Sequence, residues 1–507
     1  MKNLKILATG LALLAWSSCA LAQNETDALR YSQLGFGGTA RIQGIAGAQI
    51  ALGADASTMA GNPAGLGLYR RSEFTFSPGF SFNNTESFLG NTSTPDSRNN
   101  FNISQVGAVF TDRKADDVVS DWRSGSFGIG FTRLNSFQAN TSYTGQVEDK
   151  NSLLQSFDDN IRNFNITQAQ LDAEYGSGGN NITTLEGLAY ATYLIDVDST
   201  GNVYVPARQG VLTQGENIYS RGAQNQWDFS YGASYQDKLF IGGSLGLATV
   251  SYEQTRTYTE IAGNDEPYFS SLTLTDYFKT SGAGINFKVG LIYKPVDALR
   301  LGATIQTPTF YGLEDRYSSA MQANYKPGVF TTNSIYAQAL DGEFEYNLTT
   351  PFRANGGIAY FIGKYGFISA DVEYLDYSDA RFSISDDNPY GLDPGTGYFS
   401  QQNRRISDTY SGAMNYRIGA EARFDVFRVR AGFAHYGDAF DSNLDRARKY
   451  FTGGIGLKEK NYFLDAAYVF GKWNSYYSPY ILNDNSQPVV TTENKNTSFV
   501  ITGGFNF

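Results

Sequence analysis

The sequence predicts an all-β protein, a transmembrane antiparallel β-barrel of about 14 strands with an N-terminal hatch (plug) segment. Three observations lead to this prediction. After residue 22 no apolar run approaches the length of about 18 residues that a transmembrane helix needs. Many segments of about ten residues alternate apolar and polar side chains. The chain is also poor in charged residues, at 18 %, and rich in aromatics, at 15 %, as β proteins tend to be.

The alternation is clearest near the C-terminus. Ile418, Ala420, Ala422 and Phe424 alternate with Arg417, Gly419, Glu421 and Arg423, and Phe427, Val429, Ala431 and Phe433 alternate with Arg428, Arg430 and Gly432. One face is apolar and aromatic, and the other is polar or small, which is typical of a wall between lipid and a polar lumen. A soluble β-sandwich also alternates, but it more rarely combines this pattern with an export signal and so long a chain.

The predicted strands are even in number, as in bacterial single-chain barrels. They lie at 72–84, 101–112, 124–144, 224–235, 238–260, 270–294, 298–309, 342–362, 365–378, 411–424, 426–437, 449–459, 461–471 and 496–507. Short turns are expected at Gln236-Asp237, 294–297, Gly363-Lys364, Asp425 and Lys460, and long outer loops at 85–100, 145–223, 310–341, 379–410 and 472–495. This alternation of short periplasmic turns with long outer loops is what such a barrel requires. The domains are therefore a signal peptide at 1–22, a hatch at 23–71 and a barrel at 72–507.

The first 22 residues are predicted to be a signal peptide. Lys2 and Lys5 precede an apolar stretch, and Ala20-Leu21-Ala22 fits a cleavage site with small residues, so the mature chain is expected to begin at Gln23. The alternative is a lipoprotein anchored at Cys19. Export and the barrel pattern together predict the outer membrane of a Gram-negative bacterium, crossed many times.

Composition argues against several kinds of function. Cys19 and His435 are the single cysteine and the single histidine of the chain, which excludes a zinc site built from such ligands and a disulfide scaffold. A net charge of −11 disfavours nucleic-acid binding. His435 lies near an outer strand end with outward parity, so a Ser-His-Asp triad is not expected. We predict neither an enzyme nor a cofactor.

Residues 23–71 do not alternate as a strand pair does. They contain a Gly- and Ala-rich stretch, Gly44 to Leu52, in which small residues allow close backbone packing, followed by 55–66. Asp55 is expected to cap one helical turn, Gly61 to end it in a left-handed conformation, and Asn62-Pro63 to form a turn. A compact segment of this size fits the lumen of a barrel.

Residues Gly44 to Leu66 resemble the N-terminal signature of the FadL-type family of outer-membrane transporters for long-chain fatty acids and other hydrophobic compounds. The resemblance rests on the Gly/Ala-rich stretch and on a motif with the residues Asp55, Ser57, Asn62, Pro63, Ala64, Gly65 and Leu66. Ala46 stands where the family more often has glycine. The resemblance implies a fourteen-stranded barrel with a hatch, and ligand transfer from an outer-loop groove to a lateral exit at a kinked third strand.

Two features of the sequence fit that implied route. Apolar residues at helical spacing in the 145–223 loop form a candidate ligand groove: Leu154, Phe157, Ile161, Phe164, Leu188, Tyr193 and Leu194. They equally fit a cap that only closes the barrel. The third predicted strand contains Gly128, Gly130 and Asn135, residue types that favour bulges and breaks, so a kink is expected near 128–136.

Charged residues at inward parity form a further candidate site. They are Asp371, Glu373, Arg417, Glu421, Arg423, Arg428, Arg430 and Asp465. They are interpreted either as a cluster that binds carboxylates or latches the hatch, or as mutual salt bridges in a polar lumen.

The last strand alternates to a terminal Phe507, which resembles the signal read by the barrel-assembly machinery. The expected partners are thus that machinery, outer-membrane lipid and a hydrophobic small molecule, and the chain is expected to be a monomer. The alternative function is a structural or adhesive barrel without transport.

Overall fold

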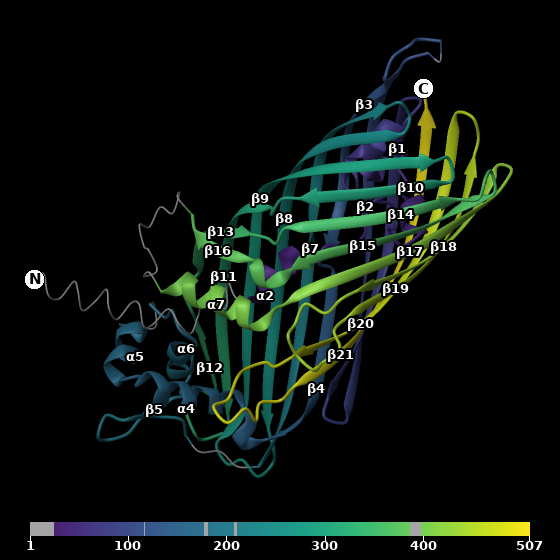
Figure 1. Ribbon diagram of the computed structural model, residues 1–507. Helices are drawn as coiled ribbons and strands as arrows, with labels where there is room; N and C mark the ends of the chain where they lie inside the picture. Colours follow the sequence, from purple (N-terminus) through teal and green to yellow (C-terminus); the bar gives the residue numbers. More distant parts are fainter. Residues whose placement is uncertain (1–24, 116, 177–180, 207–209, 386–396) are drawn as a thin grey trace, which may run out of the picture.

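The structure is a computed structural model that describes residues 25–507 except 116, 177–180, 207–209 and 386–396. The predicted signal peptide lies outside the described residues. Fourteen strand positions close into one antiparallel barrel, because the last strand pairs with the first along most of its length (Figure 1). The predicted transmembrane β-barrel is therefore confirmed.

The wall strands follow one another around the barrel in chain order. They are β1 Glu73–Leu89, β2 Thr92–Arg113, β3 Trp122–Ser136 with β4 Ala139–Glu148, β7 Val211–Tyr235, β8 Leu239–Ala262, β9 Phe269–Val296, β10 Leu299–Gln306 with β11 Phe310–Tyr325, β14 Arg353–Phe361 with β13 Gly342–Thr349, β15 Gly366–Asp376 with β16 Arg381–Ile384, β17 Gly412–Phe424, β18 Phe427–Tyr436, β19 Arg448–Lys458, β20 Tyr462–Tyr477 and β21 Val490–Asn506. Each paired name marks one wall position that a short break divides. Outside the wall, β12 Ser334–Gln338 pairs with β11, and β5 Asp196–Val197 pairs with β6 Val203–Tyr204.

Tight turns join the strands at one end of the barrel. Gln236 and Asp237, between β7 and β8, both have φ of 52°, as the two central residues of a type I′ turn do. Gly363 and Asp425 also have positive φ, at 51° and 53°. Apart from residues 114–121 between β2 and β3, the longer connections lie at the opposite end, so the end with the tight turns is the periplasmic one.

Several predicted outer loops are in part strand. Residues 85–100 extend the β1–β2 hairpin, and 310–325 form β11, a wall strand that the sequence placed in a loop. Residues 211–223 belong to β7, and 472–477 and 490–495 belong to β20 and β21. Beyond the bilayer the outward face of a strand meets water rather than lipid, so these extensions lack the apolar outward face by which the other strands were found.

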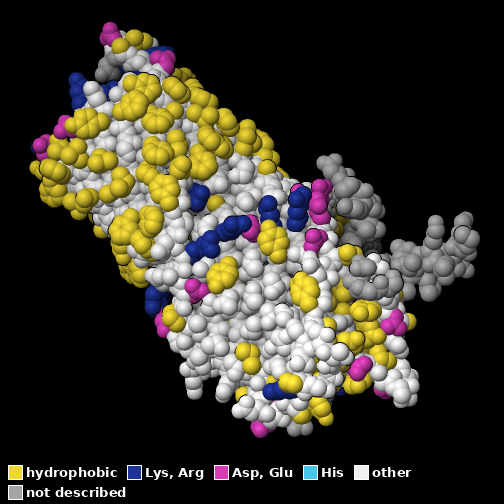
Figure 2. All heavy atoms as spheres, turned by 180° about the vertical axis from the view of Figure 1, so that it is seen from behind, with side chains coloured by type: hydrophobic (Ala, Val, Ile, Leu, Met, Phe, Trp, Pro, Cys, Tyr) yellow, Lys and Arg dark blue, Asp and Glu magenta, His cyan; other side chains and the backbone are white. Residues whose placement is uncertain are grey.

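On the face seen in Figure 2, apolar side chains cover the periplasmic half of the wall, and the outer half is largely polar. On β8 the outward side chains change from Ile241 and Leu247, both 41 % exposed, to Thr249, Ser251 and Glu253. The barrel wall therefore rises well beyond the lipid on the outer side.

Among the described residues, none of the helices is both long and apolar enough to cross a membrane.

The described helices are not part of the barrel wall. Near the outer rim are η3 Asp149–Asn151, α4 Leu153–Phe164, α5 Gln168–Tyr175, α6 Leu185–Ala191, η4 Tyr377–Asp379 and α7 Tyr398–Thr409. The N-terminal segment, residues 25–71, contains α2 Glu25–Ser32, α3 Ala40–Gln43, η1 Ala56–Met59 and η2 Pro63–Leu68. Since α3 contacts β19–β21 while η2 contacts β7–β9, this segment lies inside the lumen between opposite walls (Figure 1).

The turn around η1 forms as predicted at its start but not at its end. The Asp55 side chain accepts a hydrogen bond from the Ser57 backbone N–H at 2.9 Å, as an N-cap does. Gly61 does not have a left-handed backbone conformation. The residue that ends η1 is Ala60, with φ of −83°. The left-handed residues lie earlier, at Ala46 and Gly53 among others, which gives a physical reason why glycine suits position 46.

Candidate functional site

The Asn62-Pro63 turn is seated on a row of three wall glycines. Gly232, Gly242 and Gly290 lie in register on β7, β8 and β9. A Cβ at Gly232 would lie 2.6 Å from the Pro63 carbonyl oxygen, and one at Gly242 or Gly290 would overlap the turn itself. The wall therefore has no side chains at the three positions on which the Asn62-Pro63 turn packs.

Polar bonds hold the same turn in place. The fully buried Asn62 amide donates to the Ile50 carbonyl at 2.6 Å and to the carbonyl of Leu291 in β9 at 3.1 Å. Its side-chain oxygen accepts from the Ala64 N–H and caps η2. Gly65 is needed for a close approach, because a Cβ there would lie 2.8 Å from the Gly53 Cα.

Further glycines form seats of the same kind around the lumen. Ile45 packs on Gly419 and Gly432, Ile50 on Gly302 and Gly357, and Met59 on Gly107, Gly128 and Gly130. In each set, glycines on adjacent strands lie in register. Gly128 and Gly130, expected to favour a kink, thus lie in regular strand and make room for Met59.

Buried charges join the N-terminal segment to the wall. The Asp371 carboxylate on β15 accepts from the backbone N–H groups of Gln49 and Ile50, at 2.7 and 3.0 Å. Arg41 lies between Asp55, at 3.5 Å, and Glu421 of β17, at 3.6 Å. Burial alone would lower the pKa of Arg41, but these two carboxylates raise it above its ordinary value. The guanidinium therefore remains charged.

Other charges pair within the wall. Arg430 bridges Glu421, at 2.8 Å, and Asp465, at 2.6 Å. Glu373 pairs with Arg417 at 3.3 Å and Arg353 at 3.4 Å. The remaining two predicted residues lie nearer the periplasmic rim: Arg423 donates to Glu421, and Arg428 donates to backbone carbonyls of its own turn. The cluster thus combines salt bridges in the lumen with bonds to the N-terminal segment.

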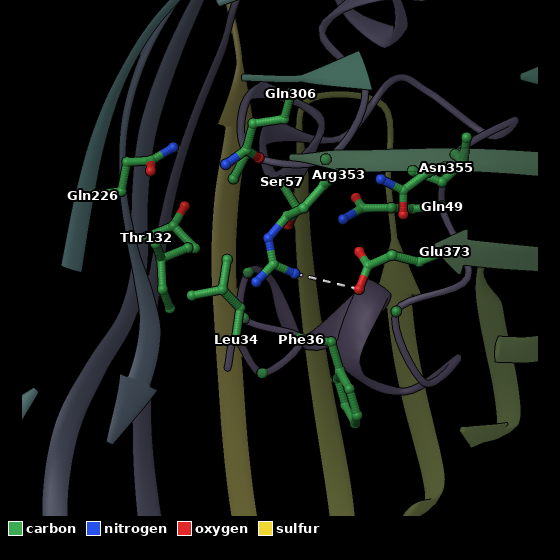
Figure 3. A pocket seen from close by; sticks show the side chains of 18 of the residues that line it. Leu34, Phe36, Gln49, Ser57, Thr132, Gln226, Gln306, Arg353, Asn355 and Glu373 are labelled. Carbon is green, nitrogen blue, oxygen red and sulfur yellow. Dashed lines mark hydrogen bonds and ion pairs between the residues drawn. The ribbon is translucent and has the colours of Figure 1, made fainter. Parts of the chain in front are cut away.

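A polar cavity of about 90 Å³ lies above the seated turn, with Gln49, Gln226, Gln306, Asn355 and the Arg353–Glu373 pair in its wall (Figure 3). Lys288 closes it from one side by donating to the Ala60 carbonyl. A volume of this size holds a few water molecules rather than an extended ligand.

Residues 35–37 separate this cavity from a second one of about 240 Å³, which lies against β1, β2 and β19–β21. The Gly35 N–H donates to the Leu134 carbonyl of β3 at 2.9 Å, and the Asn135 amide donates to the Gln33 carbonyl at 3.0 Å. The N-terminal segment therefore occupies the edge of β3 at this level.

The N-terminal segment can pair with this edge of β3 because β2 no longer pairs with β3 there. The two strands pair from Arg113–Ser124 to Gln105–Thr132 and no further. Beyond it the pairing of β3 with β7 shifts register between Arg133 and Asn135, and β3 ends at Ser136. Side chains bridge the opening farther out, where Arg98 of β2 donates to Gln138 at 2.7 Å. The third wall position is thus irregular at 133–138.

On the outer side of the polar cavity the lumen is lined by a cluster of apolar side chains, the apolar chamber, into which α2 packs. Ala28, Leu29 and Tyr31 are buried there. The chamber is lined chiefly by aromatic and leucine side chains, among them Phe137, Tyr252, Tyr311, Leu313, Tyr346, Leu375, Phe382 and Tyr410. Arg30 stacks over the Tyr252 ring at 4.1 Å. Gln224 and Arg353 donate to the last carbonyls of α2, at Tyr31 and Ser32.

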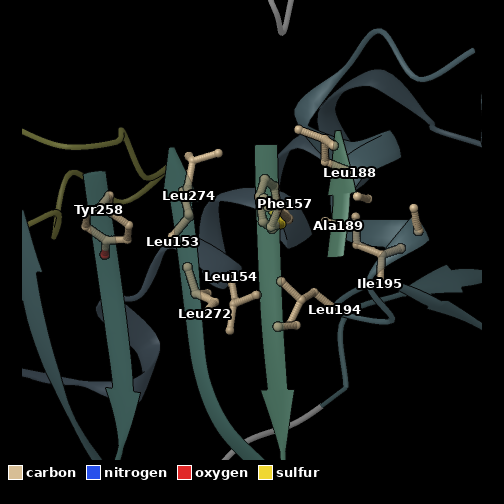
Figure 4. Close-up of a cluster of buried hydrophobic side chains, with 14 of the residues drawn as sticks. Leu153, Leu154, Phe157, Leu188, Ala189, Leu194, Ile195, Tyr258, Leu272 and Leu274 are labelled. Carbon is tan, nitrogen blue, oxygen red and sulfur yellow. The ribbon is translucent and has the colours of Figure 1, made fainter. Parts of the chain in front are cut away.

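The outer helices pack over β8, β9 and β11 in a second apolar cluster (Figure 4). Of the predicted groove residues, Leu154, Phe157, Ile161, Leu188 and Leu194 are buried in it. Phe164 and Tyr193 are both 48 % exposed instead. Tyr193 stacks on Phe330, at 5.0 Å between ring centroids. The five buried side chains therefore fill the space between the helices and the wall.

Sequence reasoning missed the glycine seats, Arg41, Arg353 and Phe137. Arg41 carries no periodic signal because it lies in a short helix of only four residues. A weak signal existed for the glycines, since many stand at inward positions of alternating strands.

The fold is similar to that of solved FadL-type channels. A FadL homologue from Pseudomonas aeruginosa aligns with a TM-score of 0.55 and 11 % identity over 93 % of this chain and all of that one. The toluene transporter TodX of P. putida aligns with a TM-score of 0.51 and 13 % identity over 93 % of this chain and 99 % of that one. No family model matches the sequence, and no curated relative does. The fourteen-stranded barrel that the N-terminal motif implied is thus confirmed.

Proposed function

We propose that this protein is an outer-membrane channel for the uptake of hydrophobic compounds, with long-chain fatty acids and small aromatic hydrocarbons as the candidate ligands. Similarity to the FadL homologue and to a toluene transporter supports this class of ligand. The N-terminal segment is the hatch in this proposal. The adhesive barrel is the competing function, and it has no use for an apolar chamber inside the lumen.

The apolar chamber is the proposed binding site. A ligand that enters from the outer helices exchanges water for aromatic and leucine side chains, which is favourable in proportion to the apolar area it buries. Because α2 fills the chamber, the ligand must displace it. Ala28, Leu29 and Tyr31 are held there mainly by apolar contacts, which a hydrophobic ligand can replace.

The proposed exit is sideways, through the opening between β2 and β3. The observation that carries this step is that β2 pairing ends at Thr132 while the N-terminal segment covers the edge of β3 beyond it. Displacement of residues 33–37 joins the two cavities and opens a path to the wall. An apolar molecule gains by leaving into lipid rather than into the aqueous periplasm.

A reversible tether tests this route. The Asn135 side-chain amide donates to the Gln33 backbone carbonyl at 3.0 Å, so the two residues are neighbours. Gln33→Cys with Asn135→Cys is expected to lock the N-terminal segment to β3 when oxidised. The only natural cysteine is Cys19, in the predicted signal peptide. We expect uptake of radiolabelled oleate and toluene to stop in oxidised cells and to recover after reduction.

The control tether joins two wall strands instead. The hydroxyl oxygens of Ser81 on β1 and Ser498 on β21 lie 2.8 Å apart, so Ser81→Cys with Ser498→Cys leaves residues 33–37 free to move. Uptake should continue when this pair is oxidised. If oxidised cells with the Gln33→Cys, Asn135→Cys variant took up as much ligand as reduced cells, the lateral route would be contradicted. If cells with the unaltered protein took up neither compound faster than cells without the protein, the adhesive barrel would be favoured.

A further inference from the structure

A row of three lysines crosses adjacent strands on the outside of the barrel. Lys449 of β19 is paired in register with Lys472 of β20, and Lys472 with Lys495 of β21. Their side chains are 49 %, 51 % and 42 % exposed. Like charges directly opposite each other on neighbouring strands destabilise a sheet, so this lysine row calls for a partner outside the wall.

The lysine row lies at the outer edge of the lipid-facing band. On β19 Lys449 lies farther from the periplasmic end than Phe451, which is 53 % exposed. On β21 Lys495 lies farther from that end than Phe499, which is 49 % exposed. Both aromatic side chains point the same way as the lysines, at even spacing along the strands. The row is on the side away from the tight turns, and therefore at the depth of the outer-leaflet headgroups.

The acidic groups near the row only partly balance it. Glu493 lies 3.6 Å from the Lys472 ammonium and 3.8 Å from that of Lys495, and Asp445 lies 3.7 Å from Lys449. All three distances exceed a hydrogen bond. Two carboxylates thus share three ammonium groups, while each lysine side chain stays about half exposed.

A second charged row on the far side of the barrel is arranged differently. Arg221, Glu253, Lys279, Arg316 and Glu343 lie in register across β7, β8, β9, β11 and β13. Here acids stand within the row, with Arg221–Glu253 at 2.5 Å and Arg316–Glu343 at 3.5 Å. Glu314, two residues from Arg316 on β11, also pairs with Arg316 at 2.5 Å. Figure 2 shows basic and acidic side chains together just beyond the apolar band. The mixed row thus has an acid at two of its five positions, Glu253 and Glu343, whereas all three positions of the lysine row are basic.

We propose that the lysine row binds the phosphate groups of a phosphorylated glycolipid of the outer leaflet, of the lipid A type. Ammonium groups bind phosphate as compact point charges. A lipid whose acyl chains lie along Phe451 and Phe499 presents its phosphates at the height of the row. This interaction is separate from transport, and so fixes a lipid to the β19–β21 face regardless of what passes through the lumen.

The test measures binding of bis-phosphorylated lipid A to protein refolded in detergent, by native mass spectrometry. The triple variant Lys449→Gln, Lys472→Gln, Lys495→Gln should bind about a hundredfold more weakly, since each lysine near an anionic surface contributes about one factor of five. The corresponding triple arginine variant should bind like wild type. Lys279→Gln, in the mixed row, is the matched control and should also bind like wild type.

Two further probes identify the source of the phosphate. Dephosphorylated lipid A should bind wild type as weakly as lipid A binds the triple glutamine variant, and inorganic phosphate alone should not compete. Unchanged binding by the glutamine variant, equal loss in Lys279→Gln, or equal binding of dephosphorylated lipid A would overturn the proposal. Competition by inorganic phosphate would overturn the assignment to a lipid. A heat-modifiability gel confirms that each variant is folded, and none of these outcomes depends on ligand uptake.

Discussion

The two ends of the N-terminal segment are held in the lumen by different forces. Residues 40–68 fit backbone to backbone against wall glycines and receive buried polar bonds from Asp371 and Glu421. By contrast, α2 rests among apolar and aromatic side chains, with Gln224 and Tyr410 donating to carbonyls near its ends and Arg30 stacked over Tyr252. Shape and charge specify one position, whereas apolar contact tolerates replacement by any apolar molecule. We infer that residues 40–68, the lower part of the segment, form the fixed closure, and that α2 is the part that a ligand can replace.

The largest expected effect comes from filling a glycine seat. In Gly290→Val the new side chain would overlap Asn62, so the turn at 62–63 cannot enter its position between β8 and β9. Overpacking of this kind costs about 1–3 kcal/mol or more. We expect the lumen to open and the single-channel conductance in planar bilayers to rise clearly above that of the wild-type protein.

The matched control is Gly503→Val on β21, where a Cβ meets no atom within 4 Å. This variant should keep the wild-type conductance. If Gly290→Val also stayed closed while remaining folded, the lower part would not be the closure, and the distinction between the two ends would fail.

A smaller and more local effect is expected at α2. Tyr31, 1 % exposed, is its largest buried side chain, and Tyr31→Ala should lower the free energy of releasing α2 by about 3 kcal/mol. Amide hydrogen exchange over residues 25–32 should accelerate, while the conductance stays at the wild-type level because residues 40–68 remain seated. Tyr219→Ala, on an outward side chain of β7 that is 46 % exposed, serves as control. A rise in conductance in Tyr31→Ala would show that both ends act as one body.

The sequence predicted the wall well wherever lipid imposes an apolar face. Alternation located the strands around Ala420, Ala431 and Phe499, and parity placed Glu421, Arg430 and Asp465 on the lumen side, where they are buried. It failed for β11, which lies largely beyond the apolar band. Its lumen face carries buried apolar side chains such as Leu313 and Met321, but its outward face is polar at Glu314, Arg316 and Gln322. The physical cause of the signal, contact with lipid, is absent there.

The site itself was less predictable, because it depends on register between strands. Gly419 and Gly432 form one seat for Ile45 only because their strands pair at that position. A single sequence contains no direct record of that pairing. The residue types of the Asn62-Pro63 motif do predict a turn. That three glycines of β7–β9 receive it follows only from the assembled barrel.

The smallest expected effect is the loss of one charge that bonds the lower part to the wall. In Asp371→Asn the bonds from the Gln49 and Ile50 N–H groups change from charged to neutral acceptors, which should destabilise this contact by about 1–2 kcal/mol. Amide exchange at residues 49 and 50 should accelerate by about tenfold. Ser369→Ala, two residues earlier on β15, is the control, because its hydroxyl bonds only within the wall, to the Ile358 carbonyl. Exchange in Asp371→Asn as slow as in this control would mean that the glycine seats alone hold residues 49 and 50. The lower part would then be fixed by shape rather than by shape and charge together.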